Sequence, residues 1–443
     1  MRQGKIVEMK AGGDVGLPGI VRMPGTAPGV RHMADPSDPL AFRVLRINQG
    51  KDFVQLHQFG SRSPWLGKSH ASGAAIGPNA AKCTIFGPVA LSAIFSADPA
   101  HAHVKWFSAY DLSMPPEPLT SLINPLFIGA VLLSICFVIV MFWLDAWLAL
   151  SPVYTEYIRR FEHWREASPD LLRIGLGLFL WALWLLGGII LTPELKIGGT
   201  YISWVQFCLS LCTLTWPTTL IAGVGVLGLY AYGIHDYGVF HMMDYPLFVG
   251  IAVYLIIHSV RQERFYRHAD VILVVSLSAT LLWGAVEKWL YWPWAMLLLE
   301  KHSYLALGMD HHTYIILAGF VEFVAAFLVL FGRTSQILSS MALIGIFSSA
   351  IAEFGKIDAV GHLMIILTLL VIILDGVDAP ACGQFARMQL RLCRVISVSL
   401  TFSTFLFLYV FIYSSMYQLT SSVYKPARRQ VTTNYLLSQG AKK

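Results

Sequence analysis

The sequence is short of charge. Asp, Glu, Lys and Arg make up 13% of its 443 residues, whereas 56% are hydrophobic, and the mean hydropathy is +0.61. Soluble chains carry about twice that share of charged residues. Several stretches run past about 18 apolar residues with almost no charge, which is long enough for a helix to cross a bilayer. We therefore expect an integral membrane protein in a lipid bilayer. The net charge of +6 is a topology signal and no sign of nucleic-acid binding.

Several motifs of nucleotide and redox chemistry are also missing. The chain has no Walker A loop, no Gly-x-Gly-x-x-Gly after a strand, no HExxH and no CxxCH haem-attachment motif. No two histidines within the apolar stretches have the spacing of a b-haem pair. The six cysteines form no CxxC, and the nearest pair, Cys208 and Cys212, lies in an apolar segment, which favours packing over a soft-metal site. We expect neither ATP-driven transport nor nicotinamide chemistry.

The first hundred residues differ from the rest. Residues 1–82 are rich in Gly, Pro, Ser and basic side chains and show no sustained periodicity. They predict a disordered extension, or one that lies before the true start codon. Residues 83–102 have the pattern of an export signal, with Lys82, an apolar run and a small-x-small cleavage pattern that ends at Ala102. Cleavage there makes His103 the N-terminus, and a retained signal-anchor is the alternative.

Ten long apolar stretches follow, and they predict an all-α polytopic transmembrane protein with about ten spans. They lie at 122–148, 171–192, 202–216, 218–236, 244–260, 269–290, 311–331, 336–353, 358–376 and 395–417.

Arginines mark one side of this topology. If every stretch crosses the membrane, one side holds Arg159, Arg160, Arg165, Arg173, Arg261, Arg264, Arg267, Arg333, Arg387, Arg391 and Arg394. The positive-inside rule places these loops in the cytoplasm and residues 103–121 outside it. The sequence therefore predicts the inner (cytoplasmic) membrane of a bacterium. The tail at 418–443 then falls outside despite Lys425, Arg428 and Arg429, which the rule does not explain.

One motif occurs twice, 117 residues apart. Residues 228–238 and 345–355 both read Gly-x5-Ile-x-acid-aromatic-Gly, and each follows one apolar stretch and precedes another. The span count agrees with a duplication, with four stretches at 171–260 and four at 269–376. We predict two tandem four-helix units of the same orientation. They are flanked by a first transmembrane helix at 122–150 and a last one at 395–417.

The second unit resembles the DoxX-like family of four-helix membrane proteins. The resemblance rests on "ILAGFVEFVAAFLVLFGR" at 316–333 and on "AIAEFGKIDAVGHLMIILTLLVIILDG" at 350–376. It covers 269–376, and it reaches 171–260 mainly through the repeat, because the first unit has no acid that matches Glu322. The resemblance implies a four-helix fold and a redox or stress context in the membrane. It supplies no agreed set of catalytic residues.

Four acids are the candidate catalytic, proton-exchanging residues: Glu287, Glu322, Asp236 and Glu353. Ionisable groups inside apolar spans are costly and mark functional sites. Glu287 and Glu322 lie within spans, where each must find a partner or stay protonated, and Lys288 is the nearest cation. Asp236 and Glu353 occupy the acid position of the repeated motif. A Glu–Lys ion pair and polar caps at helix ends are the structural alternatives.

Four further residues are candidates for cofactor binding: His362, Asp358, Tyr245 and Trp292. Asp358 and His362 are four apart, so they share one helix face. An acid and a histidine can hydrogen-bond the two carbonyls of a quinone and exchange protons with it. Trp292 lies in "WLYWPW", which forms either an aromatic belt at the membrane surface or the wall of a quinone pocket.

The candidate metal ligands are His103, His241 and Asp244. Imidazole and carboxylate suit zinc, copper or iron, and a free N-terminal histidine would chelate copper. A surface turn whose polar groups cap helix ends is the alternative for the last two.

Three functions remain open. The first is a redox-associated subunit that touches quinone, with a partner subunit that brings the electrons, so that any enzyme role is that of an accessory oxidoreductase subunit. The second is handling of copper outside the cytoplasm, and the third is a structural membrane protein with no chemistry of its own. The sequence indicates neither the substrate nor the oligomeric state.

Overall fold

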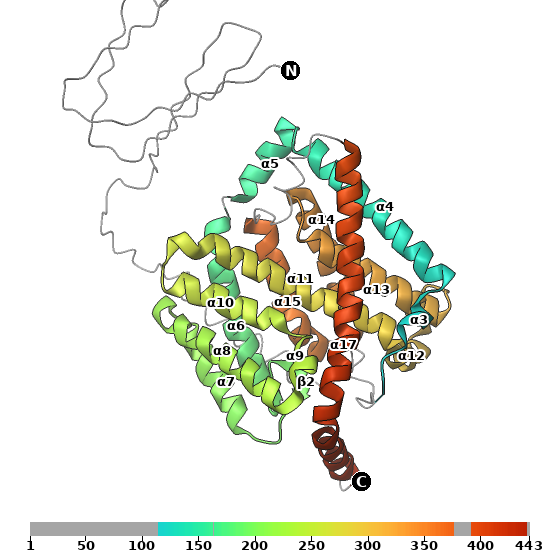
Figure 1. Ribbon diagram of the computed structural model, residues 1–443. Coiled ribbons are helices and arrows are strands. Elements are labelled where there is room, and N and C mark those ends of the chain that lie inside the picture. The colour runs from blue at the N-terminus through green and yellow to red at the C-terminus, as the bar shows by residue number, and fades with distance from the viewer. Residues whose placement is uncertain (1–113, 163, 376–390, 441–443) are drawn as a thin grey trace, which may run out of the picture. The chain divides into compact units, whose positions relative to one another are not determined.

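A computed structural model describes residues 114–162, 164–375 and 391–440. The expected extension, the signal segment and His103 lie outside these ranges. Within them the chain is helical apart from one short antiparallel hairpin (Figure 1). The prediction of an all-α polytopic protein is therefore confirmed.

The helices follow one another with short connections. The first part contains α3 (Leu119–Leu122), α4 (Pro125–Leu148), α5 (Pro152–Glu162), α6 (Ser168–Leu186), β1 (Ile189–Ile190), β2 (Thr192–Lys196), α7 (Tyr201–Cys212), α8 (Trp216–Tyr237), α9 (Val239–Met242) and α10 (Pro246–Ser259). The second part contains α11 (Tyr266–Leu290), α12 (Trp292–Lys301), α13 (His311–Leu328), α14 (Arg333–Phe354), α15 (Lys356–Asp375) and α17 (Arg391–Gly440). Short 3₁₀ turns precede α6, α11 and α13.

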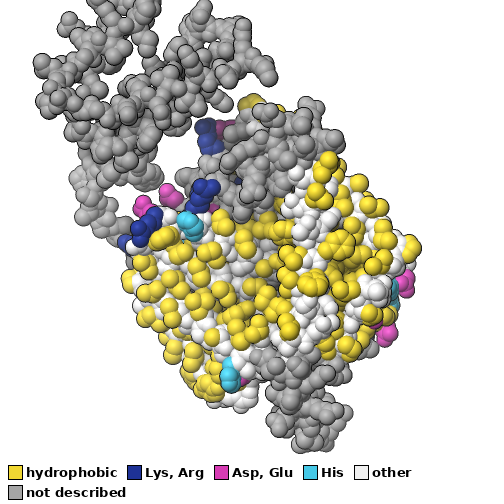
Figure 2. Space-filling model, in the orientation of Figure 1, with side chains coloured by type: hydrophobic (Ala, Val, Ile, Leu, Met, Phe, Trp, Pro, Cys, Tyr) yellow, Lys and Arg dark blue, Asp and Glu magenta, His cyan; other side chains and the backbone are white. Residues whose placement is uncertain are grey.

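Eight helical stretches in the described part of the chain are long and apolar enough to cross a membrane. This chain is an integral membrane protein. Helices α7 and α10 are shorter, and the 14 residues of α10 extend about 21 Å against a hydrocarbon core of about 30 Å. Hydrophobic side chains cover the middle of the face in Figure 2, and charged side chains lie near its edges. Helix α4 buries only a narrow stripe, from Phe127 to Met141, and exposes the rest of its apolar surface.

Two predicted boundaries are wrong. The stretch 171–192 is not one span, because α6 ends at Leu186 and Gly187 and Gly188 adopt positive φ angles of 68° and 64° that turn the chain into the hairpin. In the stretch 202–216, the helix α7 has only 12 residues and ends at Cys212. The predicted last span at 395–417 agrees with the apolar stretch Val395–Thr420, and its helix, α17, continues to Gly440.

The repeated motif is the C-terminal cap of a helix. Helices α8 and α14 each have 22 residues and end at the motif glycines, Gly238 and Gly355, whose φ angles are 87° and 83°. The N–H of each glycine donates to the carbonyl of the motif isoleucine, at 2.9 Å for Ile234 and 2.8 Å for Ile351. Only glycine adopts this backbone conformation without strain, which explains why the motif needs glycine in both places.

The helix pairings of the two predicted units correspond. Helix α6 packs on α7 and α8 on α10, whereas α11 packs on α13 and α14 on α15. The contacts between the units are reciprocal, because α10 lies along α11 and α15 lies along α6. Such reciprocal contacts are expected of two similar units that are related by a pseudo-two-fold axis. Helices α4 and α17 pack beside the second unit and against each other.

A close helix contact in the second unit depends on Gly319. A Cβ atom there would lie 2.4 Å from Nε1 of the buried Trp289 and 3.1 Å from the Ala285 carbonyl. That indole N–H donates to the Ile316 carbonyl at 3.1 Å. We expect Gly319→Ala to lower the free energy of unfolding by about 1–2 kcal/mol, because the tryptophan must move.

Thermal unfolding in detergent, followed by tryptophan fluorescence, measures this effect. Gly345→Ala is the matched control, because a Cβ atom added at this position on α14 would meet no neighbouring atom within 4 Å. That change should raise stability by about 0.5–1 kcal/mol, since alanine favours the helix. Equal effects of the two substitutions would contradict the role given to Gly319.

Candidate functional site

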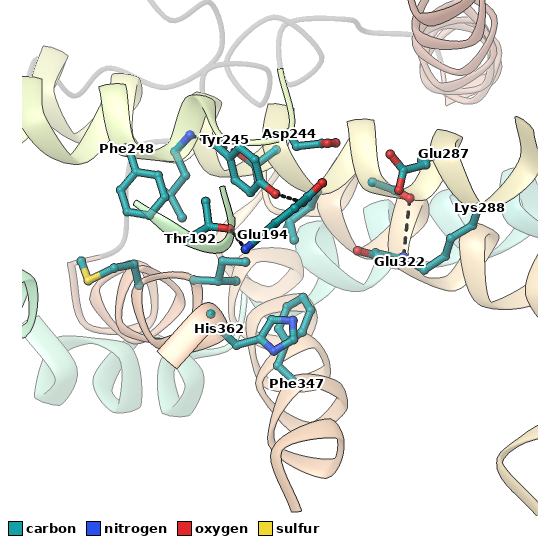
Figure 3. A pocket seen from close by; sticks show the side chains of 17 residues that line it. Thr192, Glu194, Asp244, Tyr245, Phe248, Glu287, Lys288, Glu322, Phe347 and His362 are labelled. Atoms are coloured by element: carbon teal, nitrogen blue, oxygen red, sulfur yellow. Dashed lines mark hydrogen bonds and ion pairs between the residues drawn. The ribbon is translucent and has the colours of Figure 1, made fainter. Parts of the chain in front are cut away.

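A cavity of about 100 Å³ lies between the two units (Figure 3). Its wall comes from β2, α10, α11, α13, α14 and α15 and from the turn before α10. Each water needs about 10–15 Å³ of such space, so the cavity has room for several waters. Ligand pockets usually measure about 300–1,000 Å³, so a large molecule does not fit inside it.

The polar lining of this cavity is mostly acidic. It contains four carboxylates, one amine and one imidazole: Glu194, Asp244, Glu287, Glu322, Lys288 and His362. With every carboxylate ionised, one lysine cannot balance four negative charges. Such a set favours the binding of protons or of a small cation.

Lys288 and Glu322 form an ion pair across the cavity wall. The ammonium of Lys288 on α11 donates to a carboxylate oxygen of Glu322 on α13 at 2.5 Å, and the side chains are 33% and 16% exposed. The adjacent Glu287 accepts a hydrogen bond from the Tyr413 hydroxyl on α17 at 3.2 Å. Two acids that were predicted as candidates therefore line one cavity, with the expected lysine between them.

The hairpin brings a further acid, Glu194, into the same wall. The Tyr245 hydroxyl donates to one of its carboxylate oxygens, and Nε2 of His241 lies 2.8 Å from the other. Despite this short distance, the geometry at that nitrogen does not meet the criteria for a hydrogen bond. The side chains of His241 and Glu194 are only 4% and 2% exposed. His241, a predicted metal ligand, thus contacts a carboxylate.

His362 approaches the cavity from the second unit. Its Nδ1 lies 3.0 Å from a carboxylate oxygen of Asp358, one turn earlier on α15, and both residues are buried. The imidazole stacks on the Phe347 ring at a centroid distance of 4.6 Å. At the offset of 117 residues, His362 corresponds to Tyr245 and Asp358 corresponds to His241. Tyr245 and His362, which are 117 residues apart, thus both line the cavity, and each contacts a carboxylate.

The helix of the first unit is broken at this point. Where α15 is continuous, the corresponding part of the first unit consists of α9, a three-residue turn and then α10. Asp244 and Tyr245 occupy the turn, and Pro246 begins the new helix. Interrupted helices in membrane proteins are tolerated where they are buried or line a cavity, and in transporters they line the binding site.

The other predicted site residues lie elsewhere. Asp236 is 2.9 Å from Nδ1 of the exposed His235, and Glu353 contacts His302 and the Tyr304 hydroxyl near the surface. Trp292 packs edge-on against His312 at 4.7 Å. None of these three residues lines the cavity.

The run of polar residues before α13 is a helix cap. Asp310 accepts a hydrogen bond from the Thr313 backbone N–H at 3.1 Å. This bond lowers the pKa of the Asp310 carboxyl below its usual value.

Nothing in the described ranges has the form of a metal site. No three or more His, Cys, Asp or Glu side chains are grouped there so that they could hold an ion. The predicted ligands His241 and Asp244 lie near the cavity without a third ligand of this kind. The predicted ligand His103 lies outside the described residues.

Comparisons with known proteins give no match: no family model, no curated protein sequence and no solved structure is significantly similar to this chain.

Proposed function

We propose that this integral membrane protein takes up and releases protons at the cavity between its two units. The observation that carries the proposal is that four carboxylates, a lysine and a histidine line one cavity with room for several waters. Ionisable groups in a membrane interior commonly mark proton relays and ion pathways. Waters in the cavity would connect Glu287, Glu322 and His362, and the ion pair with the Lys288 ammonium would hold the Glu322 carboxyl group in place.

We further propose that the molecule served by these protons is a membrane quinone. The DoxX-like resemblance supports this choice, and so does His362, whose imidazole lines the cavity and can hydrogen-bond a carbonyl oxygen. Because the enclosed space is small, only the carbonyl end of a headgroup would enter it. Reduction of a quinone to a quinol takes two electrons and two protons. The cavity would supply the protons and a partner redox subunit the electrons.

The expected orientation belongs to the same proposal. With the arginine-rich loops in the cytoplasm of a bacterium, the cavity lies toward the outer leaflet. Its acids would then exchange protons with the outer side.

A short-chain quinone analogue tests the quinone proposal in purified protein. A ligand that binds only the folded state raises the melting temperature with its concentration. We expect the analogue to raise the melting temperature of the unsubstituted protein. We expect His362→Gln to weaken the apparent affinity for the analogue tenfold or more, so that the melting temperature rises less. His302→Gln is the matched control, since it also removes an imidazole beside an acid but lies away from the cavity. An unchanged melting temperature of the unsubstituted protein would contradict quinone binding.

A further inference from the structure

A second buried polar cluster lies at the opposite end of the helices. We call this end the arginine end, because Arg165 and Arg333 lie there. Arg165 lies 3.5 Å from Asp270 at the start of α11. Arg333 donates from Nη1 and Nη2 to the carbonyls of Ile372 and Ile373, at 2.8 and 2.5 Å, at the end of α15. These contacts bring the beginnings of α6, α11 and α14 together with the end of α15.

Asp375, the last residue of α15, is the centre of this cluster. It is 5% exposed, and Ser168 and Tyr254, which lie beside it, are 0% and 1% exposed. The charged groups that face Asp375 are Asp270, Arg165 and Arg333. His258 stacks between Tyr254 and Tyr266, at centroid distances of 4.3 Å to each. Four helices, α6, α10, α11 and α15, thus contribute polar groups to one place.

Two buried atoms of this cluster have no hydrogen-bond partner among the described residues, namely Oδ1 of Asp375 and Nε2 of His258. The Ser168 hydroxyl interacts with the Asp375 carboxyl group. Buried polar atoms without partners are rare, because each one costs free energy in the folded state. Water molecules or a proton on the carboxyl group would satisfy them. The cluster can therefore bind water molecules and a proton.

The cluster also follows the repeat. His258 and Asp375 are 117 residues apart, so they hold equivalent positions near the ends of α10 and α15. Each lies 13 residues, or about 20 Å along its helix, beyond the cavity residue of the same unit, Tyr245 or His362. The two clusters thus mark the two ends of the same pair of equivalent helical segments. Between them, α10 and α15 bury Ile251, Leu255 and Leu369, all 0% exposed.

We infer that Asp375 is a second proton-binding site, which holds an exchangeable proton and exchanges it with water at the arginine end. Ser168 and Tyr254 would position the carboxyl group, and waters on Ser168 and His258 would pass the proton. Release leaves the carboxylate facing Arg165, whose side chain is 55% exposed and links the cluster to the surface. The apolar layer keeps this site separate from the cavity. Proton transfer from one end of the protein to the other rests on the proposed function. Proton binding at Asp375 does not depend on it.

Infrared spectroscopy of the purified protein tests the site with no quinone present. A protonated carboxyl group has a C=O stretching band apart from the amide bands, and this band shifts in D₂O. We expect Asp375→Asn to remove one such band at neutral pH. Asp170→Asn is the matched control, because Asp170 lies at the same end but is 48% exposed and pairs with Arg173. That variant should leave the band unchanged.

An Asp375→Asn spectrum identical to that of the unsubstituted protein would overturn the inference. If Asp375→Asn does not fold, Ser168→Ala provides the second test. It removes the hydroxyl beside the carboxyl group and should shift the same band, and an unshifted band would overturn the inference as well. Because neither measurement involves quinone, loss of the quinone proposal would leave this result intact.

Discussion

Replacement of Glu194 by alanine should lower the free energy of unfolding by about 3–5 kcal/mol, because a buried carboxyl group that contacts two other polar side chains is removed. The Glu194 carboxylate contacts both His241 and Tyr245, and all three side chains lie inside the protein. Without it, the imidazole loses its carboxylate neighbour, and the hydroxyl keeps only the Thr192 side chain of the hairpin as a partner. The contact also fixes β2 against the turn before α10, so its loss should loosen one wall of the cavity.

The melting temperature in detergent measures this effect, and the chain offers a matched control. Asp236 and His235 form the same type of carboxylate–imidazole contact, but the His235 side chain is 84% exposed. We expect Asp236→Ala to change stability by no more than about 0.5 kcal/mol. Glu194→Gln, which keeps the shape and an acceptor for Tyr245, should fall between the two. A Glu194→Ala variant as stable as Asp236→Ala would show that the hairpin contact is not a structural anchor.

Hydropathy was sufficient to predict most of this fold. Apolar stretches of about 20 residues, such as the one that contains α14, form helices in lipid, because a helix satisfies the backbone hydrogen bonds within the segment. The candidate pair Glu287 and Glu322 could be predicted for a related reason. An acid in an apolar stretch is costly enough to need a partner, and Lys288 was the nearest cation.

Glu194 could not be predicted in the same way. It lies in "TPELK" at 192–196, between two apolar stretches, where an acid is usual and indicates nothing. Only the fold shows that Gly187 and Gly188 turn this segment back into the protein. Asp145 was also missed, although it lies inside the apolar stretch 122–148. It accepts the backbone N–H groups of Thr334 and Ser335, at 2.7 and 3.1 Å, and so caps α14 from another helix.

The repeated motif shows what a repeat can and cannot indicate. Its glycines and isoleucines share one backbone task, the cap that ends α8 and α14. Its acids, Asp236 and Glu353, lie in the last turn of each helix, away from the cavity. The two residues that line the cavity at corresponding positions, Tyr245 and His362, lie shortly after the motif and are of different types. The match of residue types therefore identified a shared helix cap, whereas the place of Tyr245 and His362 at one cavity became visible only from the positions of the helices.

Replacement of Lys288 by methionine should lower the free energy of unfolding by about 2–3 kcal/mol. This is less than the loss of a fully buried partner, because the lysine side chain is 33% exposed. The substitution keeps the length of the side chain but leaves four carboxylates around the cavity with no ammonium group. Their mutual repulsion should then raise the affinity of the cavity for protons, so the stability of this variant should improve as the pH falls.

A double-mutant cycle with Glu322→Gln separates the ion pair from simple packing. If the 2.5 Å contact accounts for the lost stability, the double variant Lys288→Met, Glu322→Gln should lose about 1–2 kcal/mol less free energy of unfolding than the sum of the two single variants. The exposed pair Arg159 and Glu156 is the control, with side chains 73% and 46% exposed. Its cycle should give less than about 1 kcal/mol. Additive losses at Lys288 and Glu322 would mean that these side chains act independently. The cavity would then lack the paired acid and base on which its proposed proton exchange depends.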